Sequence, residues 1–240
     1  MEYQQVSFTD PYVSMVLSSP FTESFIWKVI REKGVYDPYL LNKVRDLGLI
    51  YDGSFFIDAG ANIGNHTVYW AKCYPKAMGI SVEANPKVFK VLEDNIELNR
   101  LTNVFPVRAA LSDSNGQGVE SLLDTHSPGN SSVRRNEHST DRTVTADSIY
   151  GDVFSEDADR PCSFIKIDCE HHDWEVLQGC KDIISRFKPA IAIEVWPEDL
   201  CASRDVRYLK PLIEEFLFDR GYSLHGVSGV NHIYTYGAGV

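Results

Sequence analysis

The sequence predicts an α/β fold: a seven-stranded, mostly parallel sheet with helices on both faces, preceded by an N-terminal helical cap. From residue 55 onward, short apolar runs alternate with segments whose apolar residues repeat at helical spacing. This alternation is typical of a mostly parallel sheet that helices cover on both faces. The last two apolar runs are separated only by the short link 226–231, which favours an antiparallel edge.

Residues 1–50 are expected to form the helical cap, and residues 51–240 the main domain. Apolar residues of the first segment repeat at helical spacing, at positions 25, 26, 29 and 30 and again at 40, 41, 44 and 47. Asp37 and Pro38 have the residue types of a helix N-cap followed by proline at the first helical position. Gly48 marks the expected end of this second helix.

Each strand of the predicted sheet is a short apolar run bounded by turn-forming residues. Such runs lie at 55–58, 77–82, 104–110, 164–168, 189–195, 222–225 and 232–236. Helices are predicted between them, at about 64–72, 85–98, after residue 168 and at 208–220. The remaining segment, 112–160, is rich in Ser, Asp, Asn and Gly and predicts a long functional loop rather than a separate domain.

The composition excludes several classes of protein. Hydrophobic residues make up 43% of the 240 residues and charged residues 24%, which argues against a disordered, collagen-like or coiled-coil chain. The 23 Lys and Arg against 34 Asp and Glu give a formal charge of -11. This sign opposes the basic face with which proteins bind nucleic acid or anionic membranes, so we expect no nucleic-acid partner.

The sequence also carries expectations about location. No apolar stretch approaches the roughly 20 residues of a membrane-spanning helix, and the N-terminus lacks the basic and apolar regions of a signal peptide. The five cysteines include no Cys-x-x-Cys pair and are typical of free thiols in a reducing compartment. We therefore expect a cytoplasmic protein without stable membrane insertion, and we leave open whether it forms a homo-oligomer.

The turn after the first strand predicts a ligand site. Asp58 ends that strand, and Gly60, Asn62 and Gly64 follow before a helix begins. In open parallel sheets, ligands bind at the carboxyl ends of strands, where glycines let the backbone approach them closely. The turn lacks the Gly-x-Gly-x-x-Gly of pyrophosphate binders, and a carboxylate would repel a pyrophosphate. It suits a ligand with an ammonium group and no phosphates, such as S-adenosylmethionine.

Glu83 is a second candidate for cofactor binding. It ends the second strand, where an acidic residue can accept hydrogen bonds from both hydroxyls of a ribose. The combination of Glu83 with the turn before it is more specific than either feature alone.

Five short motifs, in this order and spacing, resemble those of the FkbM-type S-adenosylmethionine-dependent methyltransferases. They are Asp-Ala-Gly-Ala-Asn-Ile-Gly (58–64), Val-Glu-Ala-Asn-Pro (82–86), Ala-Ala-Leu-Ser-Asp (109–113), Ile-Lys-Ile-Asp-Cys-Glu (165–170) and Ile-Glu (193–194). The resemblance implies a class I methyltransferase (Rossmann-like) fold and methyl transfer to a hydroxyl of a small molecule, sugar or glycolipid. It also implies S-adenosylmethionine contacts for Asp58, Gly60, Asn62, Gly64 and Glu83, with Ala110 and Leu111 near the adenine.

The acceptor side is predicted at the end of the fourth strand, beside the expected methyl group. Transfer to a hydroxyl needs a group that holds the oxygen and one that takes its proton. Asp168, Glu170 and His171 are the candidate catalytic residues. The family commonly has glycine where this sequence has His171, which leaves the identity of the base open. The same three side chains could hold a divalent metal, but metal-free catalysis is favoured and no metal site is assigned.

Two other functions compete with methyl transfer. A methyltransferase-like module that binds the cofactor without catalysis stays open, because the chain departs from the family at His171. A nicotinamide-dependent oxidoreductase is disfavoured, because the Gly-x-Gly-x-x-Gly motif is missing.

Overall fold

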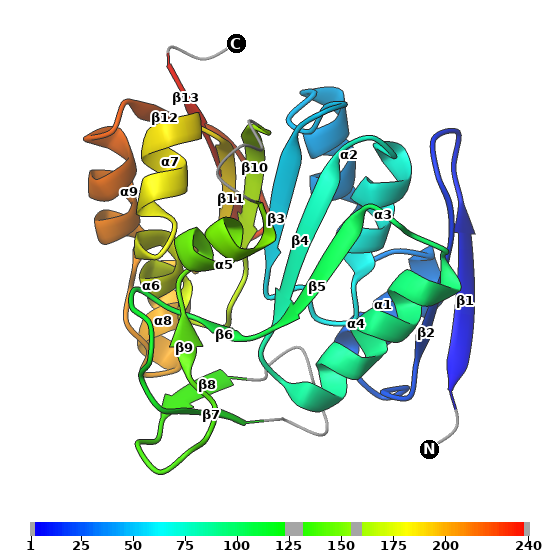
Figure 1. Ribbon diagram of the computed structural model, residues 1–240, viewed down its shortest axis with the longest axis horizontal. Helices are drawn as coiled ribbons and strands as arrows, with labels where there is room; N and C mark the ends of the chain where they lie inside the picture. The colour runs from blue at the N-terminus through cyan, green and yellow to red at the C-terminus, as the bar shows by residue number, and fades with distance from the viewer. Residues whose placement is uncertain (1–2, 123–131, 155–159, 238–240) are drawn as a thin grey trace.

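The computed structural model describes residues 3–122, 132–154 and 160–237. A seven-stranded sheet runs through its middle in the order β12-β13-β11-β10-β3-β4-β5 (Figure 1). The parallel strands are β3 (Phe55–Ala59), β4 (Met78–Glu83), β5 (Val104–Arg108), β10 (Cys162–Ile167) and β11 (Ala190–Glu194). The antiparallel edge consists of β12 (Tyr222–Ser228) and β13 (Asn231–Tyr236). The predicted sheet is thereby confirmed.

Helices cover both faces of the sheet, as predicted (Figure 1). One face carries α1 (Phe25–Lys33), α2 (Pro38–Asp46), α3 (Asn65–Cys73) and α4 (Pro86–Leu98). The other carries α5 (Ala146–Val153), α6 (Asp173–Gln178), α7 (Lys181–Phe187) and α9 (Lys210–Phe218), and α8 (Glu198–Ser203) follows β11. Each face has its own apolar cluster, built around Trp70 and Leu92 on the first and around Phe55 and Ile184 on the second.

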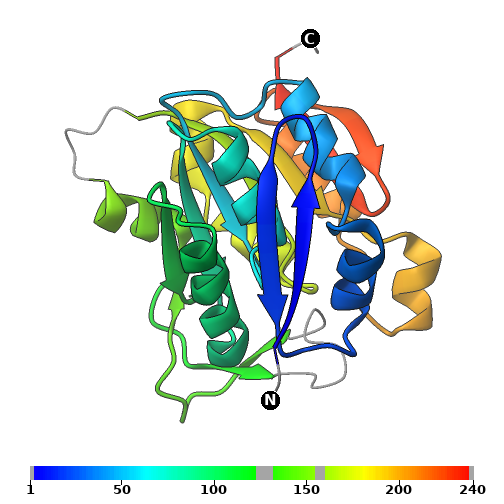
Figure 2. The same cartoon turned by 90° about the vertical axis from the view of Figure 1, so that its right-hand side faces the viewer.

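The N-terminal segment differs from the predicted helical cap. Residues 4–19 form an antiparallel hairpin of β1 (Gln4–Thr9) and β2 (Ser14–Ser19), in front of the helices in Figure 2. In the turn, Asp10 Oδ1 accepts the backbone N–H groups of Tyr12 and Val13, both at 2.7 Å. Val13, Met15 and Leu17 are buried at every second position, which is the period of a strand. The prediction of helix was therefore wrong for this stretch.

The two helices that follow the hairpin are as predicted. Asp37 caps α2, since its Oδ1 accepts the backbone N–H of Leu40 at 3.1 Å and Pro38 is the first helical residue. The hairpin and these helices share the apolar cluster of Trp70, so residues 1–50 pack directly on the first face of the sheet. The division of the chain at residue 50 stays a prediction.

Two asparagines of α4 bind the backbone of β2. Asn95 Oδ1 accepts the N–H of Ser18 at 2.7 Å, and its Nδ2 donates to the carbonyl of Ser18 at 3.0 Å. Asn99 repeats this pattern on Val16, at 2.9 and 2.6 Å. The amides thus supply the partners that a neighbouring strand would supply. Asn95 Nδ2 also donates to the carbonyl of Ile63 at 2.7 Å, in the turn after β3.

The segment 112–160 is more ordered than the predicted long loop. In its described part, β7 (Val119–Leu122) pairs with β8 (Ser132–Arg135), β9 (Thr143–Val144) pairs with β6 (Ala110–Leu111) just before the segment, and α5 follows. These strands have two to four residues each, too few for an alternating pattern to be recognised. Among the helices of the described residues, we find none with the length and apolar character needed to cross a membrane.

Candidate functional site

A pocket of about 460 Å³ opens at the carboxyl ends of β3, β4, β10 and β11. The chain passes from β3 to β4 and β5 on one side, and β10 lies on the other side of β3, so the pocket sits where the strand order reverses. This is the usual ligand position in such sheets, and the volume is typical of a small-molecule site. Of the predicted residues, those that line it are Gly60, Asn62, Glu83, Leu111, Asp168 and Glu170.

In the turn after β3, the backbone at Gly60 lies directly against the backbone at Asp168. Gly60 has a φ of +75°, and a Cβ at this position would overlap the carbonyl oxygen of Asp168. Asn62, at a φ of +51°, donates its backbone N–H to Glu83 Oε2 at 3.1 Å. Gly64 does not line the pocket: its φ is +89°, and its missing Cβ faces Leu92 of α4, so its requirement for glycine comes from its backbone conformation and from helix packing.

Glu83 is fixed by two backbone donors at the end of β4. Its Oε2 accepts the N–H of Asn62, and its Oε1 accepts the N–H of Asn85 at 2.8 Å. Each carboxylate oxygen keeps a lone pair for a further donor. Burial raises the pKa of Glu83 to about 7, although the backbone donors of Asn85 and Asn62 counteract this shift.

We expect cofactor binding to follow this titration. A ribose that donates two hydroxyls needs the ionised Glu83, so the affinity for S-adenosylhomocysteine should fall about tenfold from pH 8 to pH 6. Glu83→Gln should weaken binding at pH 8 by about 1.5–3 kcal/mol and remove that pH dependence. Isothermal titration calorimetry measures both effects, with Glu97→Gln on the exposed side of α4 as control. Unchanged affinity in a folded Glu83→Gln protein would show that Glu83 does not bind the ribose.

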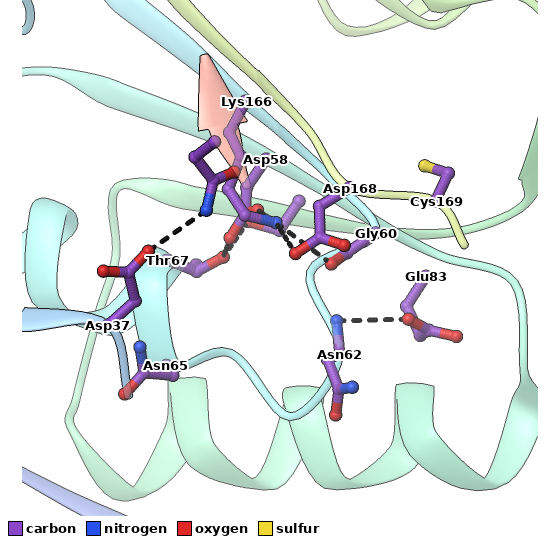
Figure 3. Close-up of polar contacts among 12 residues, drawn as sticks. Asp37, Asp58, Gly60, Asn62, Asn65, Thr67, Glu83, Lys166, Asp168 and Cys169 are labelled. Carbon is purple, nitrogen blue, oxygen red and sulfur yellow. Dashed lines mark hydrogen bonds and ion pairs between the residues drawn. The ribbon is translucent and has the colours of Figure 1, made fainter. Parts of the chain in front are cut away.

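Asp58 lies behind the pocket rather than in its wall. Its side chain is fully buried, its Oδ2 accepts the hydroxyl of Thr67 at 2.6 Å, and its Oδ1 is 3.3 Å from Lys166 Nζ. Lys166 Nζ is also 3.3 Å from Asp168 Oδ2 and 3.4 Å from the carbonyl oxygen of Gly60 (Figure 3). Burial alone would lower the pKa of Lys166, but the carboxylates of Asp168 and Asp58 outweigh it and raise the pKa.

Sequence analysis assigned no role to Lys166. Its signal was a lysine inside an otherwise apolar strand, since charged side chains are rarely buried without a partner. The buried ammonium lies between the predicted cofactor carboxylate and the predicted acceptor carboxylate, and it contacts the turn between them. Asp168, with 29% of its side chain exposed, is the carboxylate of this group that lines the pocket.

The other two catalytic candidates lie in the loop after β10, and only one of them lines the pocket. Glu170 lines the pocket, and burial together with the nearby Asp168 and Asp173 raises its pKa to about 8. His171 is not among the lining residues, and its ring packs edge-on against Trp196 with 4.2 Å between the ring centroids. His172 lines the pocket instead, and its Nε2 is 3.0 Å from the hydroxyl of Ser112.

The side chain of Asp173 holds the loop after β10 in place through two hydrogen bonds. Its carboxylate accepts the backbone N–H groups of Cys169, at 2.8 Å, and of His171, at 3.2 Å. Glu170 and His171 both have positive φ, at +51° and +71°. Such conformations persist only where the surroundings hold them, and the two bonds to Asp173 provide that support.

Three further side chains line the acceptor half, of which sequence analysis had noted only Glu194. Burial and the neighbouring Asp168 raise the pKa of Glu194 to about 9. Tyr36, whose backbone N–H and carbonyl both bond the side chain of Asn65 at 2.9 Å, approaches from the loop between α1 and α2. His66 of α3 is almost fully buried, and burial lowers its pKa to about 3.

The two residues predicted near the adenine point in different directions. Leu111 lines the pocket, next to Val82 and Ala84. Ala110 is buried and lines a separate hollow with Arg108 and Asp141. The described residues contain no group of three or more His, Cys, Asp or Glu side chains arranged to hold a metal ion.

The chain is similar to known methyltransferases. Methyltransferase sdnD of Sordaria araneosa is 24% identical over 225 residues, which cover 81% of this chain and 83% of that protein. Methyltransferase 1 of Beauveria bassiana (strain ARSEF 2860) is 30% identical over 102 residues, covering 41% of this chain and 39% of that protein. The crystal structure of methyltransferase FkbM from Methylobacillus flagellatus KT has a TM-score of 0.50 at 16% identity, over 91% of this chain and 48% of that one.

The similarity to the crystal structure shows that the two proteins share a fold. The family is shown by a match of the amino-acid sequence. Residues 58–224 match the methyltransferase FkbM domain, from Asp58 at the end of β3 into β12. The matched segment therefore contains the turn after β3, Glu83, Lys166 and the whole loop after β10. The chain belongs to the FkbM methyltransferase family.

Proposed function

We propose that this methyltransferase takes its methyl group from S-adenosylmethionine and transfers it to a hydroxyl oxygen of a small molecule, sugar or glycolipid. One observation carries the proposal: the same pocket is lined by the buried Glu83, by the turn at Gly60 and by Asp168. Glu83 can accept two ribose hydroxyls, and Asp168 lies where the reacting groups would meet.

The lining residues fit this cofactor. The turn at Gly60 has no room for a side chain, because the backbone of Asp168 lies directly against it. The ribose would be held by Glu83, and the adenine by the apolar side chains of Val82 and Leu111. Lys166 holds both the carboxylate of Asp168 and the carbonyl of Gly60 in place, so the acceptor carboxylate lies directly beside the turn.

When bound, S-adenosylmethionine supplies a methyl group on a positively charged sulfur, with a neutral thioether as the leaving group. The protein must then hold the acceptor oxygen in line with that methyl group and receive the hydroxyl proton. Asp168 is the proposed orienting carboxylate, and Glu170 is a second acceptor for the proton. His171, which packs on Trp196, is proposed to shape the wall of the acceptor site.

Two measurements test the proposal. Calorimetric titration with S-adenosylhomocysteine and with NAD should show binding of the first alone. Transfer of labelled methyl from S-adenosylmethionine to a panel of hydroxylated acceptors should then show turnover. Binding of S-adenosylhomocysteine without turnover on any acceptor would favour a non-catalytic module, and preferential binding of NAD would overturn the cofactor assignment.

A further inference from the structure

The pocket is polar at its floor and apolar at its outer part. Asp168, Glu170 and Glu194 lie on the acceptor half of the floor. The outer part is lined by side chains from two helices and the end of β11, namely Phe25 and Ile26 of α1, Leu200 of α8, and Trp196. A molecule that places its hydroxyl at Asp168 must therefore pass and touch an apolar wall.

Phe25 is the most exposed part of this wall. It is the first residue of α1, and 63% of its surface is accessible although it lines the pocket. Its ring meets Tyr36 edge-on at 6.4 Å between centroids, and Tyr36 meets His66 in the same way at 6.3 Å. The three rings form a continuous aromatic wall from the mouth of the pocket to its floor.

The outer part offers little to a polyhydroxylated molecule. Its one cation among the described lining residues, Arg204, lies over the indole of Trp196 with 4.5 Å to the ring centroid. The imidazole ring of His171 packs edge-on against the same indole, with 4.2 Å between the ring centroids. Trp196 thus already contacts Arg204 and His171, and it is less available as the flat platform on which a sugar ring would stack.

We infer that the methyl acceptor is a predominantly apolar hydroxylated molecule, an aromatic or alicyclic alcohol, whose body lies against Phe25, Ile26 and Leu200. The inference rests on the proposed function and names its substrate class. The apolar wall is continuous with the pocket floor, so an apolar body seated on it would direct its hydroxyl toward Asp168. Covering Phe25 would also remove from water the apolar surface that the free protein exposes there.

The first test measures binding without turnover. The neutral fluorescent probe N-phenyl-1-naphthylamine is titrated into protein saturated with S-adenosylhomocysteine, for the wild type, Phe25→Ala, Leu200→Ala and Tyr39→Ala. We expect saturable binding that Phe25→Ala weakens about five- to thirtyfold and Leu200→Ala weakens less. Tyr39→Ala is the matched control, because Tyr39 is 58% exposed on the neighbouring α2 and does not line the pocket.

The second test measures transfer to phenol, to 2-naphthol and to free glucose. We expect kcat/KM to rise from glucose through phenol to 2-naphthol, and Phe25→Ala to reduce the difference between the two aromatic acceptors. Glucose as the best acceptor would overturn the inference, and so would probe binding that is absent or equal in all variants.

A lipid surface is the alternative occupant of the exposed phenyl ring. If wild-type protein cosediments with phosphatidylcholine vesicles, Phe25→Ala abolishes this, and probe affinity is unchanged, then Phe25 contacts membranes and the inference is wrong. Failure of the proposed function looks different, because it would appear in the S-adenosylhomocysteine titration, which does not depend on Phe25.

Discussion

Asp168→Asn is expected to lower kcat by about 10²–10⁴, the range usual for a group that takes part in proton transfer. Asp168 ends β10, lines the pocket and keeps part of its carboxylate exposed while Lys166 holds the other oxygen at 3.3 Å. Asparagine has nearly the same shape but cannot accept a proton at this position. The measurement is single-turnover methylation at saturating S-adenosylmethionine, on an acceptor found by the panel.

The control for Asp168→Asn is cofactor affinity, since the proposal assigns Asp168 to the acceptor. We expect the Kd of S-adenosylhomocysteine to change little and His171→Ala to cost less turnover than Asp168→Asn. Wild-type turnover in the variant would refute the catalytic role and would leave Glu170 and Glu194. A large loss of cofactor affinity with normal turnover at saturation would assign Asp168 to the cofactor's ammonium group instead. Loss of activity on chelation, restored by magnesium, would indicate a metal role.

Lys166→Met should destabilise the protein by about 3–5 kcal/mol, because it leaves the buried Asp58 without its cation. Asp58 is fully buried, and Lys166 Nζ at 3.3 Å is its charged partner, whereas Thr67 supplies only a hydroxyl. Methionine preserves most of the side-chain volume, so the change reports the lost charge rather than a cavity. Urea denaturation, followed by circular dichroism, measures the free energy of unfolding.

Two further variants distinguish the loss of the buried ion pair from a general loss of stability. The same substitution at Lys90, whose ion pair with Asp94 lies on the surface, should leave the free energy of unfolding almost unchanged. Adding Asp58→Asn to Lys166→Met should recover much of the loss, because the double variant has no unpaired buried carboxylate. Equal stability of Lys166→Met and wild type would mean that the ion pair between Lys166 and Asp58 does not stabilise the fold.

The sheet could be predicted because each of its strands is a short local run of residues that can be recognised in the sequence. β3, β10 and β11 are mostly apolar runs buried on both faces, and turn residues such as Gly60 bound them. The hairpin was missed because the helical spacing of residues 25–30 and 40–47 was extended to the whole of residues 1–50, which include the alternating residues of β2. The turn at Asp10, with its two backbone bonds, was the local signal that distinguishes the two readings.

The site was predicted only as far as its residues belong to strand ends. Glu83 and Asp168 follow strands of the sheet, so topology alone brings them to one edge. Tyr36 and His66 reach the same pocket from a loop and a helix, through packing that no short motif encodes. Asp58 was expected to touch the cofactor, but its side chain lies behind the pocket and pairs with Lys166. The sequence could not show this ion pair, because the two residues are 108 positions apart and meet only through the pairing of β10 with β3.

The amide of Asn95 links the hairpin to the cofactor turn in a way that hydrogen exchange can detect. One side chain bonds Ser18 of β2 and the carbonyl of Ile63, so a fluctuation that frees β2 from α4 also removes a donor from the turn. We therefore expect the hairpin and the turn to open as one unit. A ligand held at the turn makes that opening more costly. The amide protons of Val16 and Ser18, which point at α4 rather than at the ligand, should therefore exchange more slowly once S-adenosylhomocysteine is bound.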